Sequence, residues 1–363
     1  MSEDSGRGAG RWRAHGGLSE EERRRAGVGD APVLDFSVNV NPYGPTPAML
    51  AAVRGAVLGQ YPDDGACLAR EALGQLWAVE PDQIVLGNGA AELLWLCARV
   101  VAPPGTRVLI VGPTFSEFAA GATSNGAAVN TWRATADDDF CVDVSMLCQA
   151  ITATAAEVVY LCAPNNPTGV HLKAAELQAL AQQNHAVTFV VDQAFLSLCE
   201  HAAEIVAPRP PNVLFVRSLT KDHAIPGLRV GAVVASPALA ARLELSRPSW
   251  STSAGAQAAA VAARHESDFV AECRRKLIDD RRALAAALAT LGLACVPSST
   301  TFVLAGLPGA VTGHELRDRL LGRFHILVRD CASFGLPDFI RVAARPEADR
   351  RALLAALAAT LRG

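Results

Sequence analysis

Five short apolar segments, each followed by a helical pattern or a polar loop, constrain the fold of this chain most. They are rich in Val, Ile and Phe and cover residues 83–87, 107–112, 157–163, 187–192 and 213–218. Helical patterns over 90–102 and 171–184 lie between them. This alternation is typical of an α/β domain built around a mostly parallel sheet that is buried on both faces.

The second half of the chain has a different pattern. Residues 256–292 are rich in Ala, Leu, Arg and Glu and predict a long helical stretch. Strand candidates at 301–306, 325–328 and 339–343 and a terminal helix follow, which indicates a smaller α+β domain. A length of 363 residues suits two domains. We therefore expect an N-terminal arm over 1–45, a large domain over 46–255 and a small domain over 256–363.

Composition excludes several classes of function. The net charge of −3 argues against a nucleic-acid surface, and no apolar run reaches the roughly 18 residues that a membrane span needs. The first residues are polar and glycine-rich, unlike a signal peptide. Nine cysteines occur without any Cys-x-x-Cys pair, which suits a reducing cytoplasm and speaks against a metal site. We expect a cytoplasmic protein that binds no metal, nucleic acid or membrane.

Polar residues follow four of the apolar segments. In open α/β sheets, ligands bind beyond the carboxyl ends of the strands. Each feature alone is also a common turn, helix cap or solvated lysine. Their occurrence at one rim of one sheet favours a ligand site, and the residues are Gly87-Asn88-Gly89, Asn165-Asn166, Asp192, and Ser218 with Lys221 and Arg229.

This set of groups fits pyridoxal 5′-phosphate. A lysine amine such as Lys221 can condense with the aldehyde, and a carboxylate such as Asp192 can keep the pyridine nitrogen protonated. An amide can bind the phenolic oxygen of the ring. A helix N-terminus, a serine and Arg229 can hold the phosphate. Lys221 and Arg229 would then bind two ends of one cofactor, the aldehyde and the phosphate.

Four motifs carry a family resemblance. "NNPTG" (165–169), "VVDQAF" (190–195), "SLTK" (218–221) and "GLR" (227–229) resemble the fold-type-I pyridoxal-phosphate enzymes of the aspartate aminotransferase superfamily. The resemblance runs from about His15 to the C-terminus. It implies a large domain with a mostly parallel seven-stranded sheet, a smaller α+β C-terminal domain, and a homodimer.

The resemblance also implies roles for single residues. Lys221 would bind the cofactor aldehyde, Asp192 the pyridine nitrogen and Asn166 the ring hydroxyl. Phe115 would stack on the ring, and Tyr61 would reach across from the partner subunit. The residues expected to hold the cofactor phosphate are Ala90, Ala91, Ser218 and Arg229.

Within the superfamily the chain resembles the branch that contains histidinol-phosphate aminotransferase and L-threonine-O-3-phosphate decarboxylase. Phe195 stands where aminotransferases of this branch usually carry tyrosine. The segments 15–17, 34–45, 218–229, 326–331 and 339–345 look like the decarboxylase of cobalamin synthesis. The resemblance implies that the two anionic groups of the substrate, phosphate and carboxylate, meet His15, Gly16, Asn39, Asn166, Arg329 and Arg341.

The first hypothesis is therefore decarboxylation of L-threonine O-3-phosphate to (R)-1-amino-2-propanol O-2-phosphate. Aminotransfer on histidinol phosphate or a related amino acid is the alternative, as is decarboxylation of another phospho- or phosphono-amino acid. A cofactor-sensing transcription regulator would need a DNA-binding domain before residue 30, where the segment is too short. Gln193, the pair Asp222-His223 and the surroundings of Ser253 depart from the family pattern near the substrate.

Overall fold

A seven-stranded sheet forms the centre of the large domain in the computed structural model, which describes residues 15–206, 209–309 and 311–361. The strand order is β2 (Ile84–Gly87), β8 (Gly231–Val234), β7 (Val213–Ser218), β6 (Thr188–Asp192), β5 (Val158–Cys162), β3 (Arg107–Gly112) and β4 (Ala128–Arg133). β8 runs antiparallel to β2 and β7, and the other neighbours are parallel. The expected mostly parallel seven-stranded sheet is confirmed.

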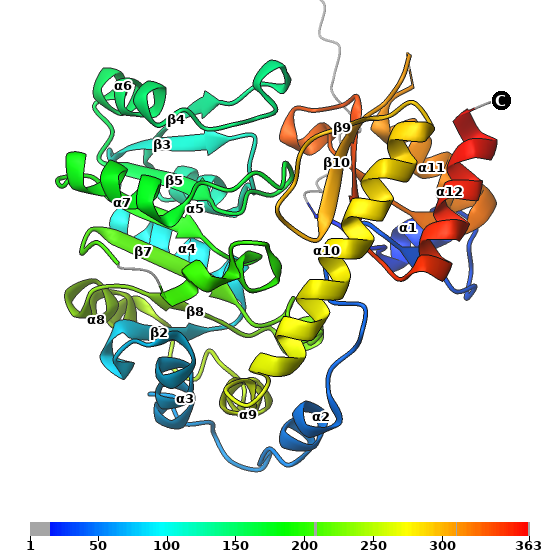
Figure 1. The fold of residues 1–363 in the computed structure, drawn as a ribbon. Helices are drawn as coiled ribbons and strands as arrows, with labels where there is room; N and C mark the ends of the chain where they lie inside the picture. Colours follow the sequence, from blue (N-terminus) through cyan, green and yellow to red (C-terminus); the bar gives the residue numbers. More distant parts are fainter. Residues whose placement is uncertain (1–14, 207–208, 310, 362–363) are drawn as a thin grey trace, which may run out of the picture.

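Helices cover both faces of this sheet (Figure 1). One face packs against α4 (Ala90–Val101), α5 (Glu117–Ser124) and α8 (Pro237–Ser246). The other packs against α3 (Cys67–Trp77), α6 (Val144–Thr154), α7 (Ala174–Gln183) and α9 (Ala254–Ala263). In β7, Val213 and Phe215 enter one core and Leu214 and Val216 the other. The continuous apolar run of each strand follows from this burial on both faces.

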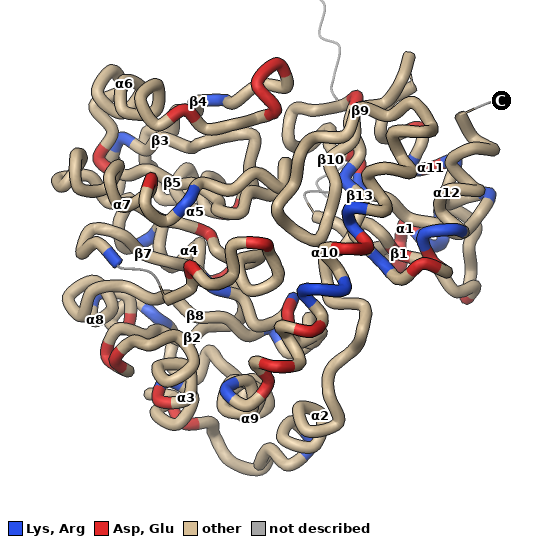
Figure 2. Tube along the Cα trace, viewed as in Figure 1, with Lys and Arg blue, Asp and Glu red and all other residues tan. Residues whose placement is uncertain are grey.

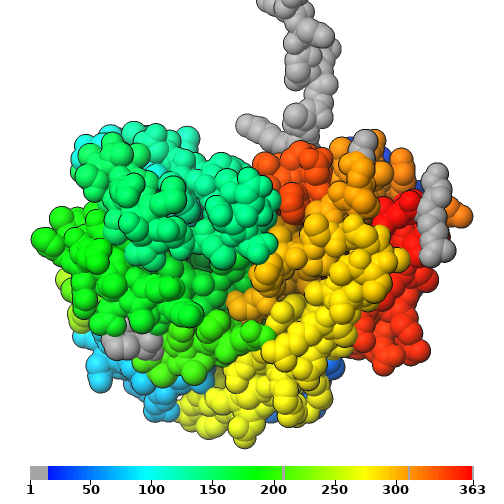
Figure 3. Space-filling model, turned by 45° about the horizontal axis from the view of Figure 1, so that its top comes forward, coloured from blue at the N-terminus to red at the C-terminus, as the bar shows by residue number. Residues whose placement is uncertain are grey.

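The small domain is built on an antiparallel sheet. Its order is β12 (Arg329–Asp330), β13 (Phe339–Ala343), β10 (Phe302–Gly306) and β9 (Ala294–Cys295). The helices α10 (Ser267–Thr290), α11 (Gly313–Phe324) and α12 (Glu347–Leu361) supply the apolar side chains that cover it. The expected α+β architecture of the second domain is confirmed, and α10 reaches from it to the large domain (Figure 3).

Residues 22–36 of the N-terminal arm pack on the small domain. β1 (Leu34–Asp35) pairs in parallel with β11 (Ile326–Leu327), and Phe36 is buried in the core of the small domain. In α1 (Glu20–Arg25), Glu22 forms a buried ion pair of 2.6 Å with Arg317. α2 (Pro47–Arg54) then joins the large domain. Residues 1–14 of the expected arm lie outside the described residues.

Two local features differ from the sequence expectation. The stretch 256–292 forms two helices, α9 and α10, because residues 264–266 are not helical. At this break Glu266 accepts a hydrogen bond of 2.8 Å from Thr46. α9 packs against α2 and α3 of the large domain, so the predicted boundary at residue 255 falls at the start of a helix that belongs with the large domain by its contacts. β4 is an edge strand with half-exposed residues, which is why its apolar signal is weak.

Charges of both signs are scattered over both domains (Figure 2). Within the described residues, no helix combines the length and the apolar character that crossing a membrane requires.

Candidate active site

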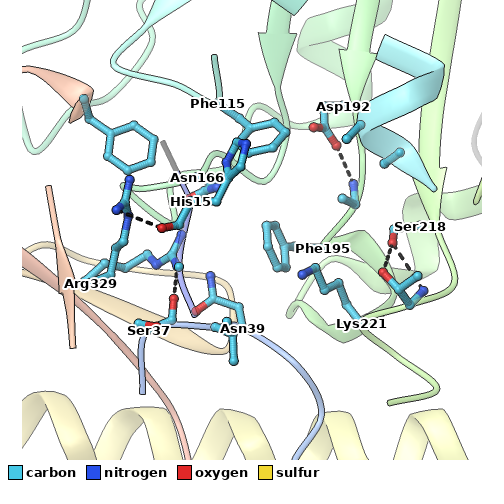
Figure 4. Close-up of a pocket in the computed structure, with 18 of the residues that line it drawn as sticks. His15, Ser37, Asn39, Phe115, Asn166, Asp192, Phe195, Ser218, Lys221 and Arg329 are labelled. Carbon is cyan, nitrogen blue, oxygen red and sulfur yellow. Dashed lines mark hydrogen bonds between the residues drawn. The ribbon is translucent and has the colours of Figure 1, made fainter. Parts of the chain in front are cut away.

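A cavity of about 220 Å³ lies where the carboxyl ends of the large-domain strands face the small domain and the arm. Figure 4 shows its side chains converging from these three parts of the chain. The strand ends contribute most of the wall, the arm contributes residues 15–16 and 37–39, and β12 and β13 close the far side. The predicted site residues that line it are His15, Gly16, Asn39, Ala90, Ala91, Phe115, Asn166, Asp192, Ser218, Lys221, Arg229, Arg329 and Arg341.

An anion-binding cradle forms one end of the cavity. Ala90 and Ala91 are the first residues of α4, where the backbone N–H groups and the helix dipole favour negative charge. Gly89 precedes them with φ +86°, and a Cβ at this position would lie 2.6 Å from Nη2 of Arg229. Glycine is therefore required for both the turn and the close approach of the guanidinium. Ser218 adds a hydroxyl that lies 2.7 Å from the hydroxyl of Thr220.

Asp192 is buried and Lys221 is half-buried in the wall of the cavity. Burial lowers the pKa of Lys221 to about 8, and the cations Arg341 and Arg229 add to this, while Asp192 opposes it. Burial raises the pKa of Asp192 to about 6, although the carboxylate accepts the backbone N–H of Ala194 at 2.8 Å. The site thus holds an amine whose pKa is near neutral pH and a carboxylate whose ionised form a nearby cation would stabilise.

Arg341 forms the opposite wall. It donates hydrogen bonds to the side-chain oxygen of Asn166 and to the carbonyl of Ser37, so it connects the small domain, the β5 loop and the arm. Its Nε has no hydrogen-bond partner among the described residues, and neither polar atom of the buried Asn39 amide has one. Buried polar atoms without partners are costly, which points to a ligand with polar atoms in this part of the cavity.

Arg329 lies beside Arg341 and holds the start of the described arm. Its guanidinium donates to the carbonyl of His15 at 3.1 Å and to Ser333 at 2.6 Å, and it packs over the ring of Phe334. The imidazole of His15 lies 2.8 Å from the carboxylate of Glu117, with its ring 5.3 Å from that of Phe115 (Figure 4). His15 was predicted to bind an anionic group, and here its side chain faces an acidic residue.

The residues of the cavity fit pyridoxal phosphate. The cradle at α4 suits a phosphate, the ring of Phe115 offers a flat apolar face, and Lys221 and Asp192 supply the amine and the carboxylate. The partnerless atoms of Asn39 and Arg341 belong to residues that line the same cavity. Lys221, Asp192 and Phe195 share one side of the cavity in Figure 4.

Tyr61 does not line the cavity of its own chain, and neither do Gly87, Asn88, Gly89 and Asn165 of the expected ligand site. The side chain of Tyr61 is 80% exposed and stacks on Trp250 with 4.7 Å between the ring centroids. Sequence reasoning missed the lining residues Ser37, Val38, Ala194, Thr220 and Phe334. Ser37 lies in "DFSVN" and Thr220 in "SLTK", two segments that also contain predicted site residues. Their position beside those residues is the sequence signal that could have identified them.

The side chains of Asp222 and His223 do not line this cavity. Both are buried behind Lys221, where one atom of each, Oδ1 and Nδ1, has no hydrogen-bond partner among the described residues. They line a separate cavity of about 170 Å³ next to Arg274 and Ser197. The departure from the family pattern at 222–223 therefore lies outside the lining of this cavity.

Comparisons with known proteins agree with this geometry. The family model described as aminotransferase class I and II matches residues 31–357. Histidinol-phosphate aminotransferase of Symbiobacterium thermophilum is 36% identical over 93% of this chain and 94% of its own length.

Two solved structures have the same fold. That of histidinol-phosphate aminotransferase from Sinorhizobium meliloti in complex with pyridoxal-5′-phosphate has a TM-score of 0.86 at 26% identity, covering 95% of both chains. That of L-threonine-O-3-phosphate decarboxylase from Porphyromonas gingivalis has a TM-score of 0.79 at 26% identity, covering 91% of this chain and 99% of that one. A family match over most of the chain, together with a cavity that suits the cofactor, identifies this chain as a pyridoxal-phosphate-dependent enzyme of the aminotransferase class I and II family.

Proposed function

We propose that the protein is an aminotransferase that moves an amino group between a phosphorylated amine of the histidinol-phosphate type and a keto acid. The sequence motifs ranked decarboxylation of L-threonine O-3-phosphate first. The relatives named above support the alternative, aminotransfer, better than that first hypothesis.

One observation carries the proposal: the lysine amine lies between anion-binding groups at both ends of the cavity. Arg229, Ser218 and the start of α4 form one end, and Arg341 and Arg329 the other. The first end suits the cofactor phosphate. The second suits the phosphate of an amine donor and the carboxylate of a keto acid, because guanidinium groups bind both by paired hydrogen bonds.

When bound, pyridoxal phosphate supplies an aldehyde for the substrate amine and a ring that accepts electrons from its α-carbon. Asp192 would hold the proton on the pyridine nitrogen, since a cation at that point favours the ionised carboxylate. With its pKa lowered to about 8, Lys221 can accept a proton at Nζ and return it within the cavity. Arg341 and Asn166 would fix the anionic end of the substrate, so that the bond to the transferred hydrogen faces Lys221.

Decarboxylation of a phosphorylated amino acid is a second candidate because of Phe195. This buried side chain lines the cavity beside Lys221 and has no hydroxyl, where aminotransferases of this branch usually carry tyrosine. With that hydrogen-bond donor missing, the α-carboxylate could be the group oriented for loss. The likeness to the Porphyromonas gingivalis enzyme supports this candidate.

A direct comparison of substrates tests the proposal. The holoenzyme is incubated with L-histidinol phosphate and 2-oxoglutarate, and glutamate formation is measured. In parallel it receives O-phospho-L-threonine, and CO₂ release is measured. Aminotransfer predicts glutamate only when both substrates are present. Release of CO₂ without a keto acid would instead support the decarboxylase, and a Lys221→Ala variant should be inactive in either assay.

We also propose that the enzyme is a homodimer in which Tyr61 serves the cavity of the partner subunit. The apolar side chains of Val57, Leu58, Tyr61, Leu68 and Trp250 are all more than half exposed in the single chain. A second copy would cover them and bring Tyr61 to a site that it does not reach in its own chain. A cytoplasmic location remains a prediction from cysteine usage.

A further inference from the structure

Three side chains gather behind the loops that leave β5 and β6, outside the active-site cavity. They are His171, which follows the β5 loop, and His201 and Glu204, which lie before and within the short helix η4 (Ala202–Val206). One ligand atom from each lies within 4.8 Å of the other two. The imidazole rings are stacked, with centroids 4.6 Å apart and an angle of 18° between their planes, so one ring must turn for both to bind one ion in their ring planes.

The two oxygens of Glu204 have different surroundings. Oε2 lies 2.9 Å from Nε2 of His171 and accepts the backbone N–H of Ala174 at 2.8 Å. Oε1 faces Nδ1 of His201 at 3.8 Å, which is too far for a hydrogen bond. Two ligands of one tetrahedral ion lie about 3.3 Å apart, because each bond is about 2.0–2.1 Å long. The gap between Oε1 and Nδ1 is therefore close to the size that a bound metal ion spans.

We propose that His171, His201 and Glu204 bind a divalent transition-metal ion of the zinc class, with water in the fourth position. Two imidazoles and one carboxylate are a ligand set that suits such ions. The side chain of His171 is only 4% exposed, whereas that of His201 is 35% exposed, so the ion would enter from the side of His201. A site with a buried side and an open side keeps an exchangeable position.

Such an ion would connect two loops of the active site. His171 lies five residues after Asn166, and His201 lies nine residues after Asp192. Among the described residues, the hydrogen bonds of Glu204 and the stacking of the two imidazole rings join these two segments at this point. Coordination by all three side chains would fix the loops relative to each other, so the metal should stabilise the folded protein.

The expectation that the protein binds no metal rested on cysteine spacing, and no cysteine takes part here. His171 and His201 are 30 residues apart, a separation that carries no ligand signature in a sequence. Arg209 and Arg217 line the small cavity that adjoins His171 and Glu204. Because their positive charges oppose cation binding, the affinity should be lower than that of a closed four-ligand zinc site.

The test uses untagged holoenzyme that has been treated with a chelator and desalted. Zinc chloride is titrated by calorimetry, bound metal is counted by mass spectrometry after gel filtration, and cobalt chloride provides visible absorption bands of the bound ion. His201→Ala leaves the contacts of Glu204 with His171 and Ala174 intact, and Glu204→Gln keeps an oxygen for the N–H of Ala174. His314→Ala is the matched control, since this exposed histidine lies 3.5 Å from Asp318 and 3.9 Å from Asp330.

We expect the wild type and His314→Ala to bind one metal ion per chain with a rise in melting temperature. Both His201→Ala and Glu204→Gln should weaken binding by about tenfold or more and remove most of that rise. Zinc binding by His201→Ala that equals that of the wild type would overturn the proposal. Wild-type protein that binds no zinc would do the same. Neither readout depends on which reaction the enzyme catalyses.

Discussion

Arg329 on β12 and Arg341 on β13 are directly opposed partners in an antiparallel strand pair. Both guanidinium groups are buried in the same wall of the cavity. The hydrogen-bond partners of Arg341 among the described residues are neutral oxygens of Asn166 and Ser37. Its charge is therefore available to an anionic ligand, and a ligand that carries phosphate or carboxylate gains from two cations at once.

Replacement of Arg341 by lysine should weaken binding of the anionic substrate. Lysine keeps the positive charge but lacks the forked guanidinium, two nitrogens of which donate to Asn166 and to the carbonyl of Ser37. Hydrogen bonds to charged groups contribute about 1.5–3 kcal/mol, so we expect the KM for the keto acid to rise roughly 10- to 100-fold. Steady-state kinetics of the holoenzyme measure this change.

The matched control is Arg345→Lys. Arg345 follows the same strand but pairs with Asp349 at 2.8 Å and does not line the cavity. Its replacement should leave the KM unchanged. An unchanged KM in Arg341→Lys itself would contradict the role that we assign to this wall.

Capture of the cofactor by the apoenzyme should depend on pH through Lys221. Only the neutral amine attacks an aldehyde, and burial, with Arg341 and Arg229, lowers the pKa of this lysine to about 8. The rate of absorbance change on mixing with pyridoxal phosphate should rise about tenfold per pH unit below 8 and level off above it. Arg341→Met removes a cation and should move the inflection to higher pH. An inflection near pH 10 in the wild type would contradict the prediction.

The same shift has a consequence for stability. An unfolded lysine has a pKa of about 10.4, so between pH 8 and 10.4 the unfolded chain binds more protons than the folded apoenzyme. The contribution of Lys221 to the free energy of unfolding should therefore rise with pH across this window. Lys221→Met should lack this rise, which denaturant titrations of the apoprotein can detect.

Gly89→Ala should weaken cofactor binding. The residue has φ +86°, and its new Cβ would lie 2.6 Å from the guanidinium of Arg229, which would have to leave the phosphate cradle. Gly105→Ala is the matched control because Gly105 has φ +85° and no atom within 4 Å of the new Cβ. Both variants should lose about 1–2 kcal/mol of stability from backbone strain. Only Gly89→Ala should also raise the Kd for pyridoxal phosphate, by about tenfold or more, which fluorescence titration measures.

The strand ends could be predicted from the sequence because two signals coincide there. A continuous apolar run marks a strand buried on both faces, and the polar residue that ends the strand marks the rim, as at Asp192 and Ser218. Resemblance to a family then assigned Asn39, Arg329 and Arg341, which lie far away in the chain.

Other features depend on tertiary packing and carry no local pattern. The helical stretch over 256–292 is interrupted where Glu266 binds Thr46, a residue 220 positions away. Thr220 lines the cavity next to Ser218, with which its hydroxyl forms a hydrogen bond. Ser37 lines the cavity next to Arg341, which donates to its carbonyl. The cluster of His171, His201 and Glu204 forms because two loops meet behind the sheet. Spacing along the chain predicts none of these contacts.

Mixing two inactive variants should restore activity if Tyr61 serves the partner subunit. A hybrid dimer of Tyr61→Ala and Lys221→Ala contains one cavity with both changes and one cavity with neither. Random exchange of equal amounts should therefore recover about a quarter of the wild-type activity. The variants are refolded together and assayed for the overall reaction, with each homodimer as the baseline. A mixture of Asp192→Asn and Lys221→Ala is the control, because both residues line the cavity of one chain and every hybrid cavity remains defective. Tyr61 is 80% exposed in the single chain. If it nevertheless served the cavity of its own chain, every hybrid cavity would carry one of the two changes and the first mixture would show no recovery.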